Sequence, residues 1–398
     1  MKVFPFEVYS SEYENLMKKL NVSGSGKEIM KNRFSMRSFM ITDISTPAAN
    51  VVKQHVLALG GEAAVPTHSV NCGEPKSDLV FSVREDKLLD LLNKFKVQCW
   101  KLPIVAAKIE ELLSKKTPWF DFKMEGADNY RPLIMGILNI TPDSFSDGGQ
   151  FDTVEKAVAQ AEKMIVDGAD IIDIGGESTR PGAQSVDAGE EISKTVPIIK
   201  EILKKWPKTV ISIDTSKSEV AKAAVEAGAK IVNDISGLNF DEKMAQICAQ
   251  LNVPVILMHI KGEPRTMQKD PKYEDLLEDV AEYFENAIEK AVKAGIKREN
   301  LIIDPGIGFG KTLEHNLALI KHLEVFHIFS LPILVGLSRK SMIGTVTGRN
   351  EPQKREAGTT AFHMKVLEKQ AAVLRVHDVA SARDALAVHM ALKESKCF

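Results

Sequence analysis

The chain has 398 residues, enough for two or three domains, and its 44% hydrophobic and 27% charged residues are typical of a soluble globular protein. Basic and acidic residues nearly balance, at 52 against 54, and no apolar run is long enough to span a membrane, so neither nucleic acid nor a membrane is expected as a partner. The four cysteines stand singly, which argues against a disulfide scaffold and predicts a cytoplasmic protein.

Residues 1–120 are predicted to form a small α/β accessory domain of unknown role. Strands are expected at 37–44, 77–83 and 97–102, and helices at 46–61, 85–95 and 105–116. The opening segment is interrupted by Pro5, Glu7 and Glu12 and does not have the pattern of a signal peptide. Residues 121–131 are expected to be a linker to a second domain.

Residues 132–398 repeat one pattern: a short apolar strand, a turn and an amphipathic helix. Eight strands are expected, at 133–140, 170–176, 209–215, 230–237, 254–260, 301–308, 332–339 and 371–379. They do not alternate between polar and apolar residues, as is typical of parallel strands covered on both faces. Gly168 and Gly228 are placed to end two of the helices. Eight such units predict a (β/α)8 TIM barrel, and the GxGxxG motif of an open dinucleotide-binding sheet does not follow the first strand.

Polar side chains stand where these strands end, and in a TIM barrel the chemistry lies at those ends. They are Asn139, Asp173, Asp214, Asn233, His259, Asp304, Ser338, Lys340, Arg375 and His377. Any one of them could merely cap the helix that follows. Together they favour a ligand whose donors satisfy buried carboxylates and amides. Carboxylates beside Lys340 suit a flat heterocycle that carries amino and carbonyl groups.

Arg375 and His377 are two residues apart and therefore point to the same face of their strand. Such a pair is suited to clamp a phosphate, although an ordinary ion pair between Arg375 and a neighbouring acid is the alternative. Asn139 is a candidate Mg²⁺ ligand, because this ion combines a few protein oxygens with phosphate oxygens. The segment 308–312, GFGKT, resembles the end of a phosphate-binding loop, but Pro305 stands where that motif requires its first glycine.

Longer motifs along the chain carry a family resemblance. They are GILNITPDSFSDGG, IIDIGGESTRPGA, SIDTSKSEVAKAAVEAGAKIVNDISG, LMHIKGEPRTMQ, DPGIGFGKT, GLSRKS and LRVHDV. Together, over residues 131–394 and in the family's order, they resemble the dihydropteroate synthases. The resemblance implies a cytoplasmic, homodimeric transferase of folate biosynthesis that sulfonamides target. It would condense 6-hydroxymethyl-7,8-dihydropterin diphosphate with p-aminobenzoate, giving 7,8-dihydropteroate and pyrophosphate.

The resemblance also implies a role for each residue of the site. Pterin-binding residues would be Asp173, Asp214, Asn233, Met258, Asp304, Phe309 and Lys340. Diphosphate would be held by Asn139, Arg375 and His377, with Mg²⁺ on Asn139. p-Aminobenzoate would lie against Phe145, Thr179, Arg180, Pro181 and Ser338. The catalytic residues would be Asp147, Lys340, Arg375 and His377, with Asp147 stabilising the cation of an SN1-like reaction.

Two other functions remain open at this point. A methyltransferase on the same barrel, moving a methyl group from a reduced folate to a corrinoid, would keep Asp214, Asn233 and Asp304 for the pterin. It would not need the STRPG and SRKS segments or the pair Arg375 and His377. The second alternative is a protein that binds a pterin without turnover, for which binding without product formation would be the signature.

Overall fold

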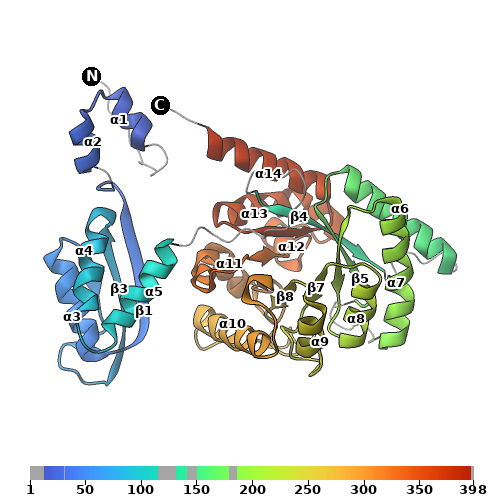
Figure 1. Cartoon of the computed structure of the whole chain (residues 1–398), viewed down its shortest axis with the longest axis horizontal. Coiled ribbons are helices and arrows are strands. Elements are labelled where there is room, and N and C mark those ends of the chain that lie inside the picture. The colour runs from blue at the N-terminus through green and yellow to red at the C-terminus, as the bar shows by residue number, and fades with distance from the viewer. Residues whose placement is uncertain (1–12, 31, 115–130, 141–149, 179–185, 396–398) are drawn as a thin grey trace. The chain divides into compact units, whose positions relative to one another are not determined.

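The structure is a computed structural model, and it describes residues 13–30, 32–114, 131–140, 150–178 and 186–395. The chain divides into two compact units near residue 117, drawn from blue to cyan and from green to red in Figure 1. None of the helices in the described segments has the length and apolar character needed to cross a membrane.

The first unit is built on a three-stranded antiparallel sheet with the strand order β1-β3-β2. The strands are β1 (Met36–Ser45), β2 (Glu62–Ala64) and β3 (Lys76–Arg84). The helices are α1 (Tyr13–Lys19), α2 (Gly24–Met30), α3 (Thr46–Ala58), α4 (Glu85–Lys96) and α5 (Leu102–Ser114). Alternate residues of β3, among them Leu79, Phe81 and Val83, are buried and join a core with Val52 and Phe95. The expected strands at 37–44 and 77–83 and the three expected helices are therefore present.

The prediction of a strand at 97–102 is wrong. Residues 97–101 connect α4 to α5, which begins at Leu102, and Trp100 and Lys101 have φ angles of 54° and 64°. Two consecutive residues in the left-handed region cannot continue a strand. The aromatic and β-branched residues that suggested a strand are on the surface, since Val97 is 83% exposed. The sheet takes its third strand from Glu62–Ala64 instead.

The second unit is a closed barrel of eight parallel strands, as predicted. They are β4 (Leu133–Asn139), β5 (Ile171–Gly175), β6 (Val210–Asp214), β7 (Ile231–Asp234), β8 (Val255–Met258), β9 (Leu301–Asp304), β10 (Leu334–Val335) and β11 (Val373–Val376). The sheet order is β10-β11-β4-β5-β6-β7-β8-β9, and a parallel bridge between Ile303 and Ile333 closes the ring. The first strand of the barrel therefore pairs with the last.

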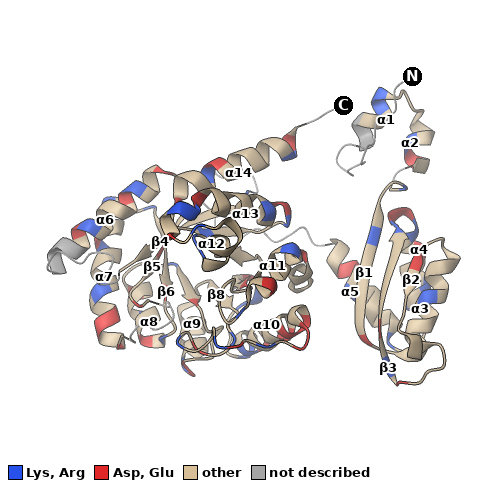
Figure 2. Cartoon of the chain, turned by 180° about the vertical axis from the view of Figure 1, so that it is seen from behind, with Lys and Arg blue, Asp and Glu red and all other residues tan. Residues whose placement is uncertain are grey.

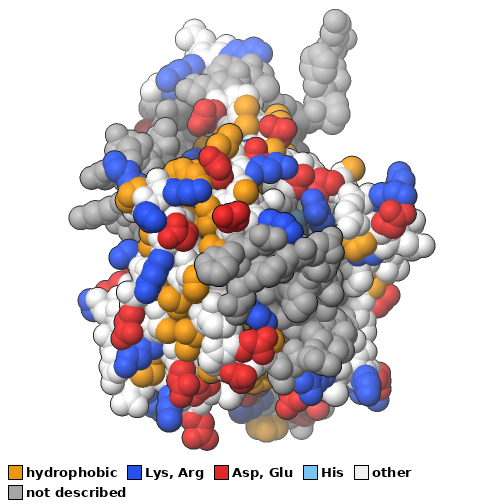
Figure 3. Space-filling model, turned by 90° about the vertical axis from the view of Figure 1, so that its right-hand side faces the viewer, with side chains coloured by type: hydrophobic (Ala, Val, Ile, Leu, Met, Phe, Trp, Pro, Cys, Tyr) orange, Lys and Arg blue, Asp and Glu red, His pale blue; other side chains and the backbone are white. Residues whose placement is uncertain are grey.

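Helices surround the barrel, as Figure 1 shows. They are α6 (Gln150–Val166), α7 (Ala188–Lys205), α8 (Ser218–Glu226), α9 (Met244–Leu251), α10 (Leu276–Lys293), α11 (Leu313–Lys321), α12 (Ser341–Thr347), α13 (Glu356–Glu368) and α14 (Val379–Glu394). Gly168 and Gly228, with φ angles of 93° and 118°, follow the ends of α6 and α8 as expected, because the left-handed turn there suits glycine. Figure 2 shows the charged residues of this unit mainly on the helices. On the face in Figure 3, basic and acidic side chains are intermingled.

The interior of the barrel follows from the two-residue period of its strands. One set of positions forms an apolar cluster that takes residues from nearly every strand: Met135, Ile171, Ile231, Ile256, Ile302, Leu334 and Val373. The neighbouring positions, such as Ile172, Ile211 and Val232, pack outward into the core shared with the helices. This alternation decides which residues nearer the strand ends face the interior.

Candidate active site

Polar residues meet at the carboxyl ends of the strands because they lie an even number of positions beyond the apolar residues that face the barrel interior. Asp173, Asn233, Asp304 and Arg375 each stand two residues beyond a member of that layer on the same strand. Asn139 stands four residues beyond Met135. In the register of the sheet Asn139 pairs with Gly175 and Gly175 with Asp214, whereas Arg375 pairs with Met135.

Arg375 joins two of the predicted pterin-binding acids. Its Nε donates to Asp173 Oδ2 at 2.6 Å, and its Nη2 donates to Asp214 Oδ2 at 2.5 Å. Asn233 Nδ2 also donates to Asp173 Oδ2, at 3.1 Å. The ion pair that the sequence left as an alternative for Arg375 is therefore present in this structure. Asp173 is fully buried and its Oδ1 has no hydrogen-bond partner among the described residues, a costly arrangement that a ligand donor would relieve.

Two acids of the site titrate far from their ordinary range. Burial raises the pKa of Asp214 to about 7, although the charge of Arg375 opposes the shift. Burial also raises the pKa of Asp304 to about 6, against the hydrogen bond from Gly306 N to its Oδ1 at 2.8 Å. Burial and the nearby Arg375 lower the pKa of Lys340 to about 8. Shifts of this kind, caused by burial beside specific charges, are typical of functional sites.

An apolar wall stands beside these charges. Met258 and Phe309 form a small buried cluster with Ile235, Ile260 and Met267. The Nζ atom of Lys340 lies 4.0 Å from the centroid of the Phe309 ring, a cation–π contact. Acids, one lysine and an apolar wall together make a site for a flat ring that carries polar groups on its edge.

Ser338 lies beside His377, a residue predicted to bind diphosphate. The Ser338 Oγ atom accepts a hydrogen bond from His377 N at 3.2 Å and is 3.1 Å from His377 Nδ1. Asn139 and Asp214 flank Gly175: a Cβ atom on this glycine would lie 3.3 Å from Asn139 Oδ1 and 3.4 Å from Asp214 Cβ. Gly175 was not singled out from the sequence, and a side chain at this position would crowd Asn139 and Asp214.

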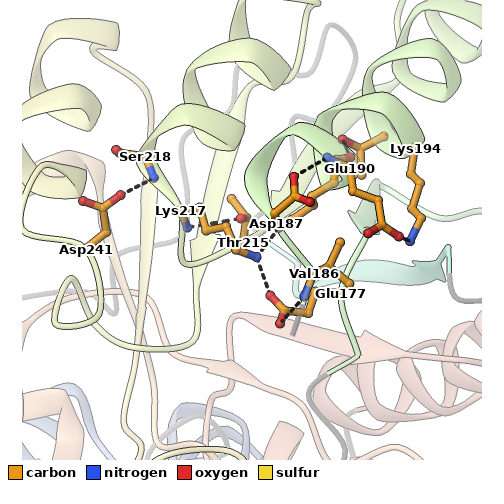
Figure 4. A network of polar contacts seen from close by, with 11 residues as sticks. Glu177, Val186, Asp187, Glu190, Lys194, Thr215, Lys217, Ser218 and Asp241 are labelled. Atoms are coloured by element: carbon orange, nitrogen blue, oxygen red, sulfur yellow. Dashed lines mark hydrogen bonds and ion pairs between the residues drawn. The ribbon is translucent and has the colours of Figure 1, made fainter. Parts of the chain in front are cut away.

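An ion-pair network at the ends of β5 and β6, shown in Figure 4, was not predicted from the sequence. Lys217 Nζ donates to Glu177 Oε2 at 2.5 Å and to Glu191 Oε2 at 2.6 Å. Glu177 Oε1 accepts from Val186 N at 3.3 Å. Glu191 is completely buried within α7, and burial raises its pKa while Lys217 opposes the shift. The signal was available, because Glu177 and Lys217 closely follow the neighbouring strands β5 and β6.

Five predicted site residues lie outside the described part of the chain. They are Phe145, Asp147, Thr179, Arg180 and Pro181.

The described residues contain no group of three or more acid, histidine or cysteine side chains that could hold a metal ion. An ion at this rim would therefore have few ligands from the protein, and the amide oxygen of Asn139, beside Asp214, is a suited donor. This donor set fits Mg²⁺ carried by a diphosphate, since Mg²⁺ is commonly held by one or two protein oxygens together with phosphate oxygens and water.

Comparison with known proteins agrees with this geometry. Residues 135–377 match the family model of the pterin binding enzymes. The dihydropteroate synthase of Escherichia coli is 45% identical over 269 residues, which are 68% of this chain and 94% of that protein. A crystal structure of the Yersinia pestis enzyme in a sulfonamide drug complex superposes with a TM-score of 0.63 at 43% identity, covering 67% of this chain and 95% of that one.

A Xanthomonas albilineans dihydropteroate synthase in complex with 7,8-dihydropteroate gives a TM-score of 0.61 at 41% identity, with 67% of this chain and 95% of that chain covered. The family match lies wholly within the barrel, and it includes every described residue of the predicted site. The chain belongs to the dihydropteroate synthase family of pterin-binding transferases.

Proposed function

We propose that this chain condenses 6-hydroxymethyl-7,8-dihydropterin diphosphate with p-aminobenzoate to give 7,8-dihydropteroate and pyrophosphate. The observation that carries the proposal is the cluster of Asp173, Asp214 and Arg375 at the barrel rim, in which one buried carboxylate oxygen has no donor among the described residues. Membership of the family supplies the reaction, and the Xanthomonas relative is described in complex with 7,8-dihydropteroate.

The pterin is held by its polar edge and its flat face. Asp173, Asp214, Asn233 and Asp304 accept from its amino and ring N–H groups, and Lys340 donates to a ring oxygen or nitrogen. Met258 and Phe309 cover the face of the ring. Support comes from the burial of Asp173, Asn233 and Asp304, which makes each unsatisfied oxygen costly and each ligand donor favourable.

The diphosphate lies against Arg375, His377 and Asn139. A guanidinium has five N–H donors, and the carboxylates Asp173 and Asp214 occupy two of them here, so donors remain for an anion. Mg²⁺, when bound through Asn139, supplies charge neutralisation of the diphosphate oxygens.

The reaction begins when the bond between the exocyclic methylene carbon and the diphosphate oxygen breaks, and both electrons leave with the diphosphate. Arg375 and His377 stabilise the charge that develops on the leaving group. The resulting cation is delocalised into the dihydropterin and is stabilised by Asp147. The amine of p-aminobenzoate, held by Phe145, Thr179, Arg180, Pro181 and Ser338, then attacks the methylene carbon. Its extra proton passes to water or pyrophosphate.

The decisive experiment measures pyrophosphate release from the pterin diphosphate with Mg²⁺, with and without p-aminobenzoate. Release coupled to dihydropteroate formation is expected, and Lys340→Ala should mainly weaken pterin binding. A surface variant on α10, Lys293→Met, serves as the matched control, because its ammonium is exposed and forms an ion pair with Glu289 on the same helix. Pterin binding without coupled product would contradict the proposal and favour methyl transfer or simple binding.

We further infer that the enzyme works in the cytoplasm as a homodimer on small-molecule substrates, with no nucleic-acid or membrane partner. Support for a dimer comes from exposed apolar side chains on the C-terminal helices: Val346 is 53% exposed, Val388 53% and Leu392 65%. Light scattering would give the mass of the particle in solution. A monomeric mass across the working concentrations would contradict this inference.

A further inference from the structure

The loop between β9 and α11 encloses a buried lysine. Lys311 is 3% exposed, and its Nζ atom lies 2.8 Å from His259 Nδ1, 2.9 Å from Gly306 O and 3.0 Å from Phe309 O. A lysine ammonium has three N–H donors, and each has one acceptor here. The lysine of the GFGKT segment therefore points into its own loop, which is why the resemblance of this segment to a phosphate-binding loop does not extend to its function.

His259 is suited to accept from that ammonium. It is 3% exposed at the end of β8, and its ring packs edge-on against Tyr283 with centroids 4.7 Å apart. Burial and the charge of Lys311 lower the pKa of His259 to about 2, so the ring is neutral. A neutral imidazole with its proton on Nε2 presents a lone pair at Nδ1, the nitrogen that faces Lys311. Burial also lowers the pKa of Lys311, to about 7, against the opposing charge of Asp304.

The backbone of the loop is shaped around this pair. Gly306, Gly308 and Gly310 have φ angles of 65°, 83° and 65°, in the left-handed region that favours glycine. A Cβ atom on Gly306 would collide with the carbonyl oxygen of His259. The loop is thus pressed against the end of β8, and the carbonyl groups of Gly306 and Phe309 turn inward to the ammonium.

Both edges of this loop reach the proposed pterin site. At one edge Gly306 N donates to Asp304 Oδ1 at 2.8 Å, which orients the carboxylate. At the other edge the ring of Phe309 lies under Lys340 Nζ. The carbonyl oxygens that Lys311 binds belong to Gly306 and Phe309, the same residues that make these two contacts.

We propose that Lys311 and His259 are positioning residues, which hold the loop 305–310 so that Asp304 and Phe309 are set for the pterin ring. Neither residue touches the substrate, and both act by holding the loop in place. The inference rests on the proposed function, because it names what fixes one side of that same site.

The test compares Lys311→Met, which keeps the length of the side chain and removes its charge, with the surface control Lys293→Met. Lys311→Met should weaken the binding of 6-hydroxymethylpterin, followed by its own fluorescence, and raise the KM for the pterin diphosphate at least about tenfold. The KM for p-aminobenzoate should change much less. Unchanged affinity for 6-hydroxymethylpterin in a folded Lys311→Met protein would overturn the proposal.

Variants of His259 keep the test decisive if Lys311→Met does not fold. Asparagine can offer an oxygen near the position of Nδ1, whereas leucine offers no acceptor, so His259→Asn should bind 6-hydroxymethylpterin more tightly than His259→Leu. Equal binding by these two variants would overturn the role of His259.

Amide hydrogen exchange tests the positioning role of Lys311 independently of the proposed function. The amides of Gly306 and Gly308, bonded to Asp304 Oδ1 and Asn316 Oδ1, should exchange faster in Lys311→Met than in Lys293→Met. This readout needs no substrate, so it would still report on the loop if the wild-type protein made no dihydropteroate. Unchanged exchange at both amides would contradict the inference.

Discussion

Arg375 bridges Asp173 and Asp214, and both of these contacts affect the charge of Asp214. Burial raises the pKa of Asp214, the guanidinium of Arg375 lowers it, and the charge of Asp173 on the neighbouring strand raises it further. The result is an Asp214 carboxyl that titrates near neutrality in a site where it must accept hydrogen bonds. Its protonation state is therefore a property of the cluster, which can be tested by changing one member.

Activity should depend on pH through Asp214. Its pKa is about 7, so protonation below that pH removes an acceptor and kcat/KM for the pterin diphosphate should fall. Because the charge of Arg375 lowers this pKa, Arg375→Leu should move the acidic limb of the profile to higher pH as well as lower its plateau. The measurement is kcat/KM against pH for both proteins. An acidic limb at the same pH in the variant would contradict the coupling.

His363 offers a test of stability away from the site. It is fully buried on α13, and neither ring nitrogen has a hydrogen-bond partner among the described residues. His363→Leu should therefore raise the free energy of unfolding by about 1–2 kcal/mol at neutral pH. Urea unfolding of both proteins measures this change, and a less stable variant would be the opposite result.

The same substitution should change the pH dependence of stability. Burial lowers the pKa of His363 to about 4 in the folded protein, whereas an unfolded histidine titrates near 6.5. The folded state binds fewer protons between these values, so its stability is lost as the pH falls from about 6.5 to about 4. The leucine variant lacks this contribution, and its advantage should grow over that window. A difference in the free energy of unfolding that does not change with pH would contradict the low pKa assigned to His363.

At the scale of elements, the strand ends could be predicted from the sequence because the period of a strand is short and regular. Once Ile171 and Ile302 face the interior, Asp173 and Asp304 must do so as well. The partners of Arg375 could not be predicted, because its side chain reaches Asp173 and Asp214 on β5 and β6, two strands that do not pair with β11. The family resemblance supplied the assignments to individual substrates.

Other features escaped prediction for physical reasons. The strand Glu62–Ala64 is three residues long, too short to show a period. The connection at 97–102 has strand-forming residues but takes left-handed backbone angles at Trp100 and Lys101, and local composition does not reveal these. The inward direction of Lys311 depends on His259, which is distant in sequence.

Lys217, which follows β6, forms ion pairs with Glu177, which follows β5, and with Glu191. These ion pairs should be essential to stability. Lys217→Met leaves Glu191 completely buried without its cationic partner, so the free energy of unfolding should fall by about 3 kcal/mol. The double variant Lys217→Met with Glu191→Gln removes the unpaired charge and should recover part of the loss. Urea unfolding of the three proteins measures both effects. A double variant no more stable than the single one would contradict this account.

At the scale of the whole molecule, each unit has its own hydrophobic core. The core of the first unit is drawn from residues 44–109, and the clusters of the barrel from residues 134–386. A chain that begins at Asn129 should therefore fold, and it should form dihydropteroate at a rate close to that of the full chain. The coupled assay and circular dichroism of the shortened protein test this. A folded but inactive barrel would show that the first unit takes part in catalysis.

The closure of the barrel by β4 and β11 has a consequence for how the protein is made. During translation β4 leaves the ribosome first among the barrel strands, and its partner β11 leaves last, so the ring cannot close before nearly the whole unit has been synthesised. The strands of the first unit, by contrast, all emerge before β4, and that sheet can form while the ribosome is still working. One edge of nascent β4 stays unpaired until β11 has emerged, and during that interval a chaperone that covers the edge is most useful.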